Sequence, residues 1–272
     1  MLALLCLATP PTVLATGATG RTGSQLKNDV TPLKVLVTGA TGRTGLQLYK
    51  QLKSDSRVGE VRALVRRGSG AKARAAAALN CSACDETEGI FYGDVTAPAT
   101  LAPAFQGVDT VAIAVGVGGG VNKTVEKAVE FIGVENQVAA LMNGTSSADP
   151  RVVLCSSMMT TDPKPLPFMG GSVLFWKLNA EAYIGYAGVG AVVVKPCGLT
   201  DGAKGGKELT VGHNDVVDIS GGVITRADVA AVMAEAVARR SRDLRFDLCV
   251  GKGAPTTDLG AVLEAAREPW QY

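Results

Sequence analysis

The chain has 272 residues, of which 47% are hydrophobic and 19% charged, and its formal net charge at pH 7 is +2. This length allows one large α/β domain with a substantial core. A charge so close to zero, with no block of lysines or arginines, argues against a nucleic-acid track. We therefore expect a small-molecule substrate or a partner protein complex, and no nucleic acid.

The first residues, "MLALLCLATPPTVLA", are apolar but too short to span a bilayer. They also lack the positively charged start of a secretory signal. No other stretch approaches the ~18 uninterrupted apolar residues of a membrane helix. The sequence therefore predicts a protein without a membrane span.

From residue 34 onward, short apolar runs alternate with helical patterns. Strands are expected at residues 34–38, 60–65, 89–95, 109–116, 151–157, 190–196 and 245–251. Helices are expected at 45–55, 124–143, 174–188, 226–239 and 256–268. This alternation predicts the α/β class, with a doubly wound parallel sheet (a Rossmann fold) covered by helices on both sides. The glycine-rich segments 197–224 and 251–256 are expected to form a small C-terminal substrate lobe.

A glycine-rich sequence occurs twice, at residues 13–26 and 35–48, with twelve of fourteen letters identical. A phosphate-binding loop needs a strand before it, a helix after it and a second strand beyond. Only the second copy has all three, because Pro32 and a new strand follow the first too soon. We expect residues 1–32 to be an appended extension, or alternatively a strand at a sheet edge, and residues 33–272 to form one NAD(P)-binding domain. The loop residues predicted to contact the cofactor are Gly39, Thr41, Gly42, Arg43, Thr44 and Gly45.

The end of the second expected strand bears on the choice of cofactor. NAD sites place an acidic residue there for the ribose 2′-hydroxyl, but this chain has Arg66 and Arg67. A guanidinium suits a 2′-phosphate, and Arg43 adds another cation nearby. The sequence thus favours NADP(H), although two solvated surface arginines would give the same pattern. Asp94, after the third strand, is expected either to meet the adenine or simply to cap a turn.

The chain has six cysteines, and only Cys81 and Cys84 form a closely spaced pair. A single Cys-x-x-Cys is a weak metal signal, so we expect two plain thiols and no metal site, with a redox or metal role as the alternative. Cys155 and Cys197 lie in apolar runs and are expected to pack as small hydrophobic residues. This usage fits a reducing compartment.

Several motifs together resemble the atypical short-chain dehydrogenase/reductases, particularly NmrA-like NAD(P)-binding proteins of plants and algae. They are "VLVTGATGRTG", "GDVTAPATLAPAFQGVDTV", "VLFWKLNAEAYI", "VVVKPCGLTDG" and "ITRADVA", and the resemblance covers residues 33 to 272. It implies a sheet of about seven strands with NADP along its C-terminal edge. Beside Asp94, the positions it places near the cofactor are Val95, Ala114, Val115, Gly116, Lys177, Pro196 and Gly198. Plant and algal relatives suggest a plastid, with the cytoplasm as the alternative.

The family's usual catalytic set is a serine after the fifth strand and a Tyr-x-x-x-Lys on the next helix. By resemblance, Ser156 (or Ser157) and Lys177 fill the serine and lysine positions, whereas Val173 stands where the tyrosine would be. Because valine cannot exchange a proton, ordinary ketone reduction is expected to be poor. A desolvated Lys177 with a depressed pKa could take over the proton transfer, or the acceptor could need no enzyme-supplied proton.

Five further residues carry weaker expectations. Tyr183 and Tyr186 are expected to be packing residues, and His213 a solvated loop residue, with a substrate role as the alternative. Asn136 matches a supporting position of the family or is an ordinary polar helix residue. Arg226 is expected to fix the substrate lobe.

Two functions follow from these features. The first is an NADPH-dependent reductase of a small quinone, flavin or carbonyl acceptor, based on the cofactor loop with Ser156 and Lys177. The second is a non-catalytic NADP(H)-binding sensor, assembly factor or structural subunit of a larger complex. It is based on Val173 and the apolar N-terminal extension, and the family resemblance alone cannot decide between the two.

Overall fold

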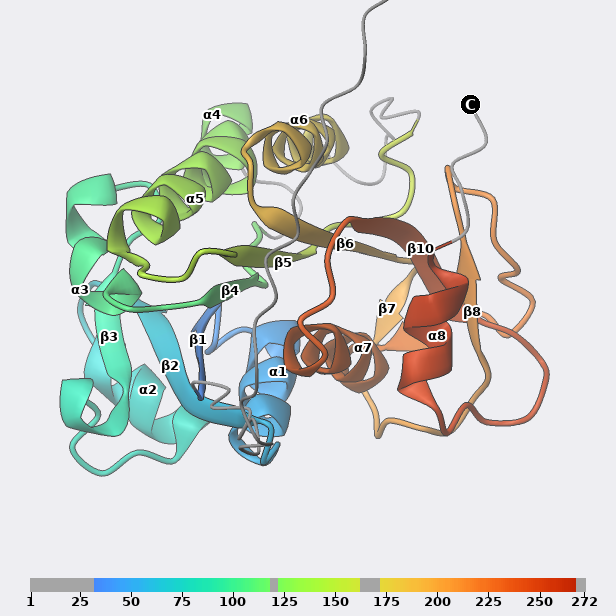
Figure 1. Ribbon diagram of the computed structural model, residues 1–272, viewed down its shortest axis with the longest axis horizontal. Helices are drawn as coiled ribbons and strands as arrows, with labels where there is room; N and C mark the ends of the chain where they lie inside the picture. The colour runs from blue at the N-terminus through green and yellow to red at the C-terminus, as the bar shows by residue number, and fades with distance from the viewer. Residues whose placement is uncertain (1–31, 118–121, 162–171, 268–272) are drawn as a thin grey trace, which may run out of the picture. The chain divides into compact units, whose positions relative to one another are not determined.

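The computed structural model describes residues 32–117, 122–161 and 172–267. Its main sheet has eight strands in the order β3-β2-β1-β4-β5-β6-β10-β8 (Figure 1). All neighbouring strands are parallel except β8, which pairs antiparallel with β10. The strands are β1 (Leu33–Thr38), β2 (Val58–Arg66), β3 (Ile90–Gly93), β4 (Thr110–Ile113), β5 (Arg151–Cys155), β6 (Gly190–Pro196), β8 (Leu209–Gly212) and β10 (Leu244–Val250). A separate parallel pair is formed by β7 (Leu199–Thr200) and β9 (Ile224–Thr225).

Helices cover both faces of this sheet (Figure 1). One face carries α1 (Arg43–Lys53), α2 (Ala71–Leu79), α7 (Arg226–Ala238) and α8 (Leu259–Ala265). The other carries α3 (Ala102–Phe105), α4 (Lys123–Lys127), a π-helical turn (Ala128–Ile132), α5 (Gly133–Gly144) and α6 (Val173–Tyr186). Two 3₁₀ turns, Glu86–Glu88 and Pro98–Thr100, flank β3. This is the doubly wound α/β architecture that the strand and helix patterns predict.

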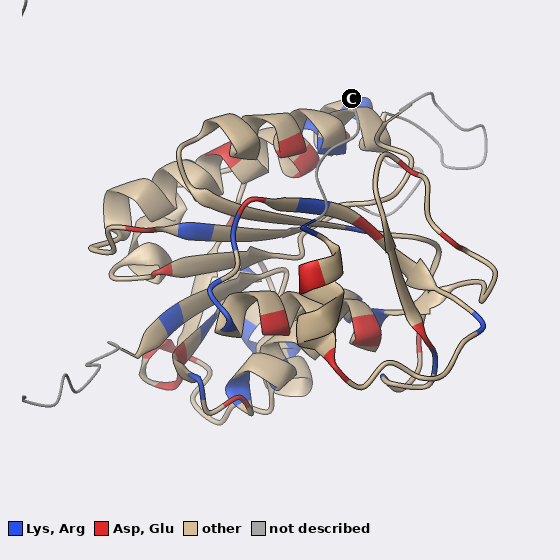
Figure 2. Ribbon diagram, turned by 45° about the vertical axis from the view of Figure 1, so that its right-hand side comes forward, with Lys and Arg blue, Asp and Glu red and all other residues tan. Residues whose placement is uncertain are grey.

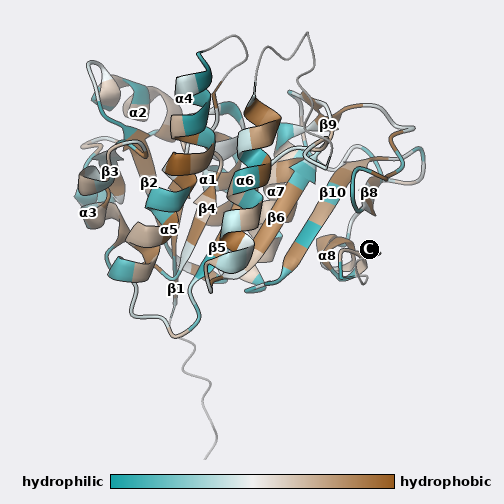
Figure 3. Ribbon diagram, turned by 90° about the horizontal axis from the view of Figure 1, so that it is seen from above, coloured by the Kyte–Doolittle hydropathy of each residue, from teal (hydrophilic) through white to brown (hydrophobic). Residues whose placement is uncertain are grey.

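The strands are buried because helices cover them from both sides. Their colouring is mostly hydrophobic, with hydrophilic bands on β10 (Figure 3). Val35 and Val37 of β1 belong to the hydrophobic cluster under α1 and α7, whereas Leu36 belongs to the one under α5 and α6. Strands with two buried faces read as continuous apolar runs, which is why the sequence located them.

The strand order reverses at β1. The chain moves outward from β1 through β2 to β3 and then returns to place β4 on the other side of β1. Thr38 and Ile113, the last residues of β1 and β4, lie opposite each other. In open α/β sheets, ligands bind in the crevice beyond the carboxyl ends of the strands at such a point. We therefore expect a ligand site at the loops after β1, β2 and β4.

The sheet has one strand more than the resemblance implied. The additional strand is β8, in a segment that we expected to be part of an irregular substrate lobe. It pairs with the exposed edge of β10, from Asp247 opposite Gly212 to Val250 opposite Leu209. Only four residues pair, and all are half-buried, so no buried apolar run marks this strand in the sequence. The expectation of about seven strands is corrected to eight.

Other differences concern helix bounds. The helix expected at 124–143 is interrupted by the π-helical turn at Ala128–Ile132. The last helix begins at Leu259 because the Asp258 side chain caps it by accepting from the N–H of Ala261. Within the part of the chain that the structure describes, no helix has both the length and the apolar character needed to cross a membrane.

The second copy of the glycine-rich sequence forms β1, the following loop and the first turns of α1. The first copy, at residues 13–26, lies outside the described residues. The division into an extension (1–32) and a domain (33–272) therefore remains a prediction.

Candidate functional site

The loop after β1 depends on glycines for two different reasons. Gly39 has a φ of +71°, in the left-handed region that side chains avoid, and a Cβ there would collide with the backbone of Ala114 at the end of β4. A Cβ on Gly45 would collide with the carbonyl of Gly39, so Gly45 allows α1 to pack against the loop. The N–H of Gly42 donates to the Gly39 carbonyl at 2.8 Å. These contacts hold the loop in a tight turn directly over the strand ends.

The N-terminus of α1 is suited to an anion. Gly42 is its N-cap in extended conformation, no side chain caps the helix, and its first turn contains no acidic residue. The first N–H groups of a helix have no partners within the helix, and the helix dipole gives this end a partial positive charge. Gly42 is exposed, so a phosphate can approach the backbone here without meeting a side chain.

Basic side chains lie next to this loop. Arg66 and Arg67 follow one another at the end of β2, and both are exposed, as is Arg43 in the first turn of α1. No carboxylate among the described residues pairs with Arg43 or Arg66. Arg67 donates from Nε to the carbonyl of Tyr92 at 2.9 Å, which leaves its terminal nitrogens for other acceptors. The arrangement offers unneutralised positive charge beside the helix N-terminus.

An open pocket of about 520 Å³ adjoins Arg67. Its lining includes Gly70 and Lys72 from the start of α2, Cys84 and Asp85 from the segment that leads into β3, and Tyr92 of β3 itself. In the view of Figure 2, basic and acidic residues are interspersed over the molecule. The pocket therefore combines local basic groups with a surface that is otherwise of mixed charge.

Asp94 caps its own turn, one of the two alternatives that the sequence left open. Its Oδ1 accepts from the N–H of Thr96 at 2.8 Å and from the Thr96 hydroxyl at 2.7 Å. The neighbouring Val95 is held by α5, because Asn136 donates its side-chain N–H to the Val95 carbonyl at 2.8 Å. Asn136 thus positions the loop after β3.

The segment after β4 leads directly to the lysine of α6. Ala114 and Val115 are half-buried, and Gly116 is exposed. The N–H of Val117 donates to Oε1 of Glu130 at 2.8 Å, and the other oxygen of Glu130 is 2.8 Å from Nζ of Lys177. Glu130 lies in the π-helical turn and is 3% exposed. This buried carboxylate joins the β4 loop to α6.

The charge of Lys177 follows from this contact. Burial alone would lower the pKa of Lys177, but the negative charge of Glu130 and its hydrogen bond outweigh burial and raise the pKa. A lysine with a raised pKa remains protonated at neutral pH. The hypothesis that desolvation depresses the pKa of Lys177 is therefore wrong for this arrangement.

Val173 begins α6, one turn before Lys177 and on the same face. The indole N–H of Trp176, also on this face, donates to the Ser172 hydroxyl at 2.9 Å, and that hydroxyl donates to the buried Glu126 at 2.8 Å. Phe131 stacks on Trp176 at 6.0 Å between ring centroids, and Phe175 meets it edge-on at 4.8 Å. The start of α6 is therefore aromatic and has no tyrosine.

Ser156 lies directly after β5, and its hydroxyl donates to Oε1 of Glu181 in α6. The other oxygen of Glu181 receives Nη2 of Arg245 at 2.6 Å. Glu181 is 5% exposed and so is Ser156. While this hydrogen bond persists, the Ser156 proton is not available to a substrate oxygen. Ser157 is half-buried and has no hydrogen-bond partner among the described residues.

A second buried ion cluster lies further along the sheet. Lys195 of β6 is 0% exposed, and its Nζ is 2.9 Å from Oδ1 of Asp215 and 3.0 Å from Oδ1 of Asp247. Asp215 also accepts the N–H groups of Met159 at 2.7 Å and Thr161 at 2.9 Å. Burial would raise the pKa of Asp215, but the Lys195 and backbone hydrogen bonds lower it overall. The cluster ties the segment after β5 to the loop after β8.

The structure corrects the expectation of free thiols. Cys81 and Cys84 form a disulfide, and so do Cys197 and Cys249. The second bridge follows from the pairing of β6 with β10, in which Pro196 lies opposite Leu248, so the next residues of the two strands meet. Cys197 is therefore not simply a packed hydrophobic residue, and the argument for a reducing compartment loses its basis. Glu88 lies close to Cys81 and Cys84, but both sulfurs are taken up by the disulfide.

Cys155 is the free cysteine of the described chain, and it is buried as expected. Burial raises the pKa of the Cys155 thiol, which argues against a role as nucleophile. Pro196 is buried at the end of β6, and Gly198 is exposed just beyond it. Gly198 accepts the N–H of Ile224 at 2.9 Å, where β7 and β9 come together.

The remaining expectations have mixed outcomes. Tyr183 packs against the cluster under α5 and α6, as expected, but Tyr186 is 91% exposed and is not part of either hydrophobic cluster of the described residues. His213 is half-buried rather than solvated, with Nδ1 at 3.1 Å from the carbonyl of Arg245. Arg226 is buried and bonds Asp201 at 2.8 Å, which fits a structural role in the lobe.

The buried glutamates Glu126, Glu130 and Glu181 were not predicted from the sequence. A signal for the first two was present, because they stand four residues apart in a helical pattern and therefore share a face. Glu181 stands four residues after Lys177 in the same way. Nothing in the sequence shows, however, that Glu130 would meet Lys177 and Glu181 would meet Ser156.

Comparison with known proteins agrees with this geometry. A model of the family described as NAD(P)H-binding matches residues 39–240. The chain belongs to this NAD(P)H-binding family. It is a member of the atypical, NmrA-like branch of the short-chain dehydrogenase/reductases, as the sequence motifs predicted.

Two plant proteins are identical to this chain at about a third of the aligned positions. Sanguinarine reductase of Eschscholzia californica is 31% identical over 95% of this chain and 97% of its own length. An uncharacterized chloroplastic protein of Arabidopsis thaliana is 32% identical over 93% of this chain and 74% of its own length. These matches relate this chain to a reductase-like group of proteins.

Two solved structures share the fold. A Bacillus halodurans protein described as an NAD-dependent epimerase/dehydratase has a TM-score of 0.66 and 24% identity, covering 86% of this chain and 99% of its own. A short-chain dehydrogenase/reductase from Veillonella parvula, solved in complex with NADP, has a TM-score of 0.59 and 13% identity, covering 82% and 97%. At these identities the likeness establishes the Rossmann-like fold alone.

Proposed function

We propose that this protein is an NADPH-dependent reductase of a small planar acceptor, such as a quinone or a flavin, that takes a hydride without a proton from the enzyme. The observation that carries the proposal is the contrast within one site. The loop and arginines after β1 and β2 leave phosphate-binding groups free, whereas α6 has Val173 where a proton donor would stand. The first part supports NADPH, and the second part limits the acceptor.

The residues present fit the cofactor. The N–H groups at the start of α1 would hold the pyrophosphate, with Gly42 allowing close approach and Thr41 and Thr44 beside it. Arg66 and Arg67, with Arg43, would hold the 2′-phosphate, and Asp94 and Val95 would border the adenosine. Ala114, Val115 and Gly116 after β4, and Pro196 and Gly198 after β6, would face the nicotinamide half. NADPH supplies the hydride.

Lys177 would orient the nicotinamide ribose rather than move a proton. Its ion pair with Glu130 fixes the ammonium, and the raised pKa keeps it charged. A fixed cation can donate hydrogen bonds to ribose hydroxyls. The aromatic start of α6, with Phe175 44% exposed, supports a planar acceptor. Ser157 would contact the acceptor oxygen if Ser156 remains bonded to Glu181.

One observation favours a second function, a non-catalytic NADP(H)-binding subunit or sensor. Both residues expected to carry the chemistry, Ser156 and Lys177, are bonded to buried glutamates. A group satisfied within the fold is less available to a substrate. We place this second function behind the reductase because sanguinarine reductase covers nearly the whole chain. The chloroplastic relative supports a plastid location, which we propose with the cytoplasm as the alternative.

The test is NADPH consumption with a quinone panel, a flavin panel and a ketone panel. We expect turnover of quinones or flavins and little of ketones. The Val173→Tyr variant is expected to gain ketone reduction, because general acid catalysis contributes roughly 10²–10⁴-fold when the donor is well placed. Val173→Phe is the matched control for the added ring without the hydroxyl. Strong wild-type turnover of an ordinary ketone would contradict the restriction, and tight NADPH binding with no turnover of any acceptor would favour the second function.

A further inference from the structure

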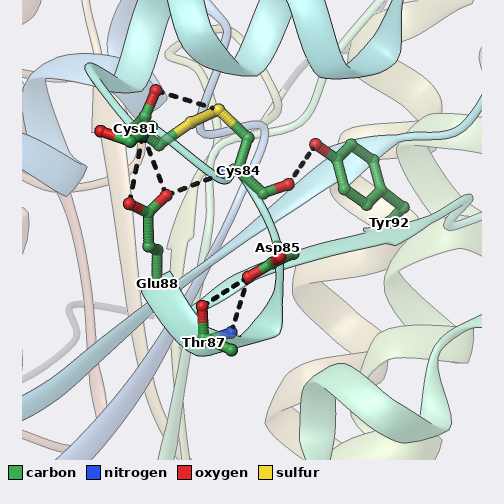
Figure 4. The surroundings of a disulfide bond; sticks show 7 residues. Cys81, Cys84, Asp85, Thr87, Glu88 and Tyr92 are labelled. Atoms are coloured by element: carbon green, nitrogen blue, oxygen red, sulfur yellow. Dashed lines mark hydrogen bonds between the residues drawn. A yellow bond between two sulfur atoms is a disulfide. The ribbon is translucent and has the colours of Figure 1, made fainter.

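The Cys81–Cys84 disulfide lies outside the site described above but beside its arginines. It closes a short loop between α2 and β3, at the edge of the sheet, with 5.0 Å between the two Cα atoms. Figure 4 shows the loop with Glu88 on one side and Tyr92 on the other. No role in the proposed reduction requires this bond.

The two cysteines differ in exposure. Cys84 is 1% exposed, whereas Cys81 is half-buried. An incoming thiolate can therefore reach Sγ of Cys81, with Cys84 as the leaving group. The other disulfide has the same pattern, with Cys249 0% exposed and Cys197 half-buried, so exposure alone does not separate the two bonds.

The length of chain between the cysteines is what separates the two bonds. Cys81 and Cys84 are three residues apart, whereas Cys197 and Cys249 are 52 residues apart. A disulfide restricts the unfolded chain more when it closes a longer loop, so the short bridge contributes less to folding. The Cys81–Cys84 bond can therefore open without unfolding the domain.

Opening the bond would release a constrained residue. Cys84 has a φ of +50°, in the left-handed region that a residue with a side chain rarely adopts. The disulfide helps to hold it there, together with Glu88, which accepts the N–H groups of Cys84 at 2.8 Å and Ser82 at 3.1 Å (Figure 4). The constrained backbone presents the Cys84 carbonyl to Tyr92, whose hydroxyl donates to it at 2.7 Å.

Tyr92 connects this loop to the arginine of the candidate cofactor site. Its backbone carbonyl accepts from Nε of Arg67 at 2.9 Å. Cys84, Tyr92 and Arg67 also line the same pocket. A movement of the Cys84 backbone would thus reach the guanidinium through two hydrogen bonds and a shared wall.

We propose that Cys81–Cys84 is a thiol–disulfide exchange site for a dithiol reductant, and that its reduction weakens binding of the 2′-phosphate beside Arg67. The second half rests on the proposed NADPH site. One thiolate of the reductant attacks Sγ of Cys81, the S–S bond breaks, and Cys84 leaves as a thiolate that takes up a proton. The second thiol of the reductant attacks the sulfur bonded to Cys81 and releases Cys81, which is also protonated. Two electrons and two protons pass to the pair, and the reductant becomes a disulfide.

The experiment equilibrates the full chain in buffers of reduced and oxidised dithiothreitol. Free thiols are alkylated and assigned to each cysteine by mass spectrometry. We expect Cys81 and Cys84 to become reduced under conditions that leave Cys197 and Cys249 bonded. Calorimetry then compares NADPH and NADH on the two forms. We expect NADPH affinity to fall by about three- to tenfold on reduction, the effect of one weakened hydrogen bond to a charged partner, while NADH affinity stays the same.

The variants separate the bond from the reductant. Cys81→Ser/Cys84→Ser is expected to bind NADPH as the reduced protein does in both buffers, whereas Cys155→Ala should respond as wild type does. A pair that stays oxidised until Cys197–Cys249 is reduced, or equal NADPH affinities of the two forms, would overturn the inference alone. Failure of both forms to bind NADPH would overturn the proposed function and this inference with it.

Discussion

Two regions at the carboxyl edge of the sheet differ in whether their polar groups are paired. After β1 and β2, the helix N-terminus lacks a capping side chain, and Arg43, Arg66 and Arg67 are exposed. After β5 and β6, the charged groups are buried and paired, with Lys195 between two aspartates. The first region has groups available for a ligand, while the second has used most of its groups to hold its own loops.

This difference separates a region with groups free for a ligand from one whose charged groups are satisfied within the fold. Free backbone N–H groups and unpaired cations are costly unless water or a ligand satisfies them, so they mark a binding region. A buried ion pair is satisfied within the fold and indicates positioning. The predictions below test whether each region behaves as its contacts indicate.

The largest effect is expected from the scaffold region. Asp215→Asn removes one of the two carboxylates beside the fully buried Lys195. Breaking a buried ion pair by removing one partner costs about 3 kcal/mol or more in unfolding free energy. The measurement is urea unfolding of wild type and variant at neutral pH. Asp218→Asn is the matched control and should change little, because the exposed Asp218 side chain of the same loop accepts from the backbone and hydroxyl of Ser220 and from no buried lysine among the described residues.

The pH dependence of that difference has a defined sign. The folded-state pKa of Asp215 lies below the ordinary value of 3.8, so its contribution is complete above that value. As the pH falls through the lowered pKa, the carboxylate is protonated and the contribution is lost. The wild-type advantage should therefore be constant from neutral pH down to about 5 and shrink below about 4. An advantage that grows on acidification would contradict the ion-pair account.

The next effect concerns the phosphate loop. Gly42→Val places a branched side chain over the N-terminus of α1, where we propose the pyrophosphate lies. Loss of about two charge-assisted hydrogen bonds corresponds to roughly a hundredfold weaker NADPH binding, measured by calorimetry. Gly20→Val, at the equivalent place in the first copy, is the control. If Gly20→Val abolishes binding and Gly42→Val does not, the first copy is the working loop.

A smaller effect is expected from Lys177, which lies between the two regions. Lys177→Ala removes the proposed ribose contact and should weaken NADPH binding about tenfold, the usual effect of one hydrogen bond from a charged donor. Because the folded-state pKa of Lys177 is raised above 10.5, its charge is lost only above that pH. Binding should therefore show no titration of this group between pH 7 and 9. Lys177→Arg retains the charge and should keep most of the affinity.

Much of the fold was readable from the sequence because each central strand is an apolar run with both faces buried. The loop of the second glycine copy was readable for the same reason, since β1, α1 and β2 surround it, and its use by the cofactor remains a prediction. Strand β8 was not, because it is short, half-buried and stabilised by pairing with β10. Its existence depends on a partner 35 residues or more away in the chain, which local patterns do not record.

The site shows the same division. The glycine turn after β1 and the arginines after β2 were predictable because the turn's backbone conformation and phosphate chemistry favour those residue types at that spacing, and their contact with a phosphate remains a prediction. The pairings of Glu130 with Lys177 and of Glu181 with Ser156 were not, because each joins two elements through tertiary packing. The Cys197–Cys249 bridge likewise follows from the register of β6 and β10, which the sequence alone does not fix.

The central claim is that the region after β1 and β2 reads the 2′-phosphate of NADPH, and calorimetric titration tests it most directly. Wild type should bind NADPH about ten- to a hundredfold more tightly than NADH, as one or two guanidinium–phosphate contacts provide. Arg66→Ala/Arg67→Ala should remove this preference and leave NADH binding unchanged. Equal affinities of wild type for NADPH and NADH, or a preference that survives in the double variant, would contradict the account.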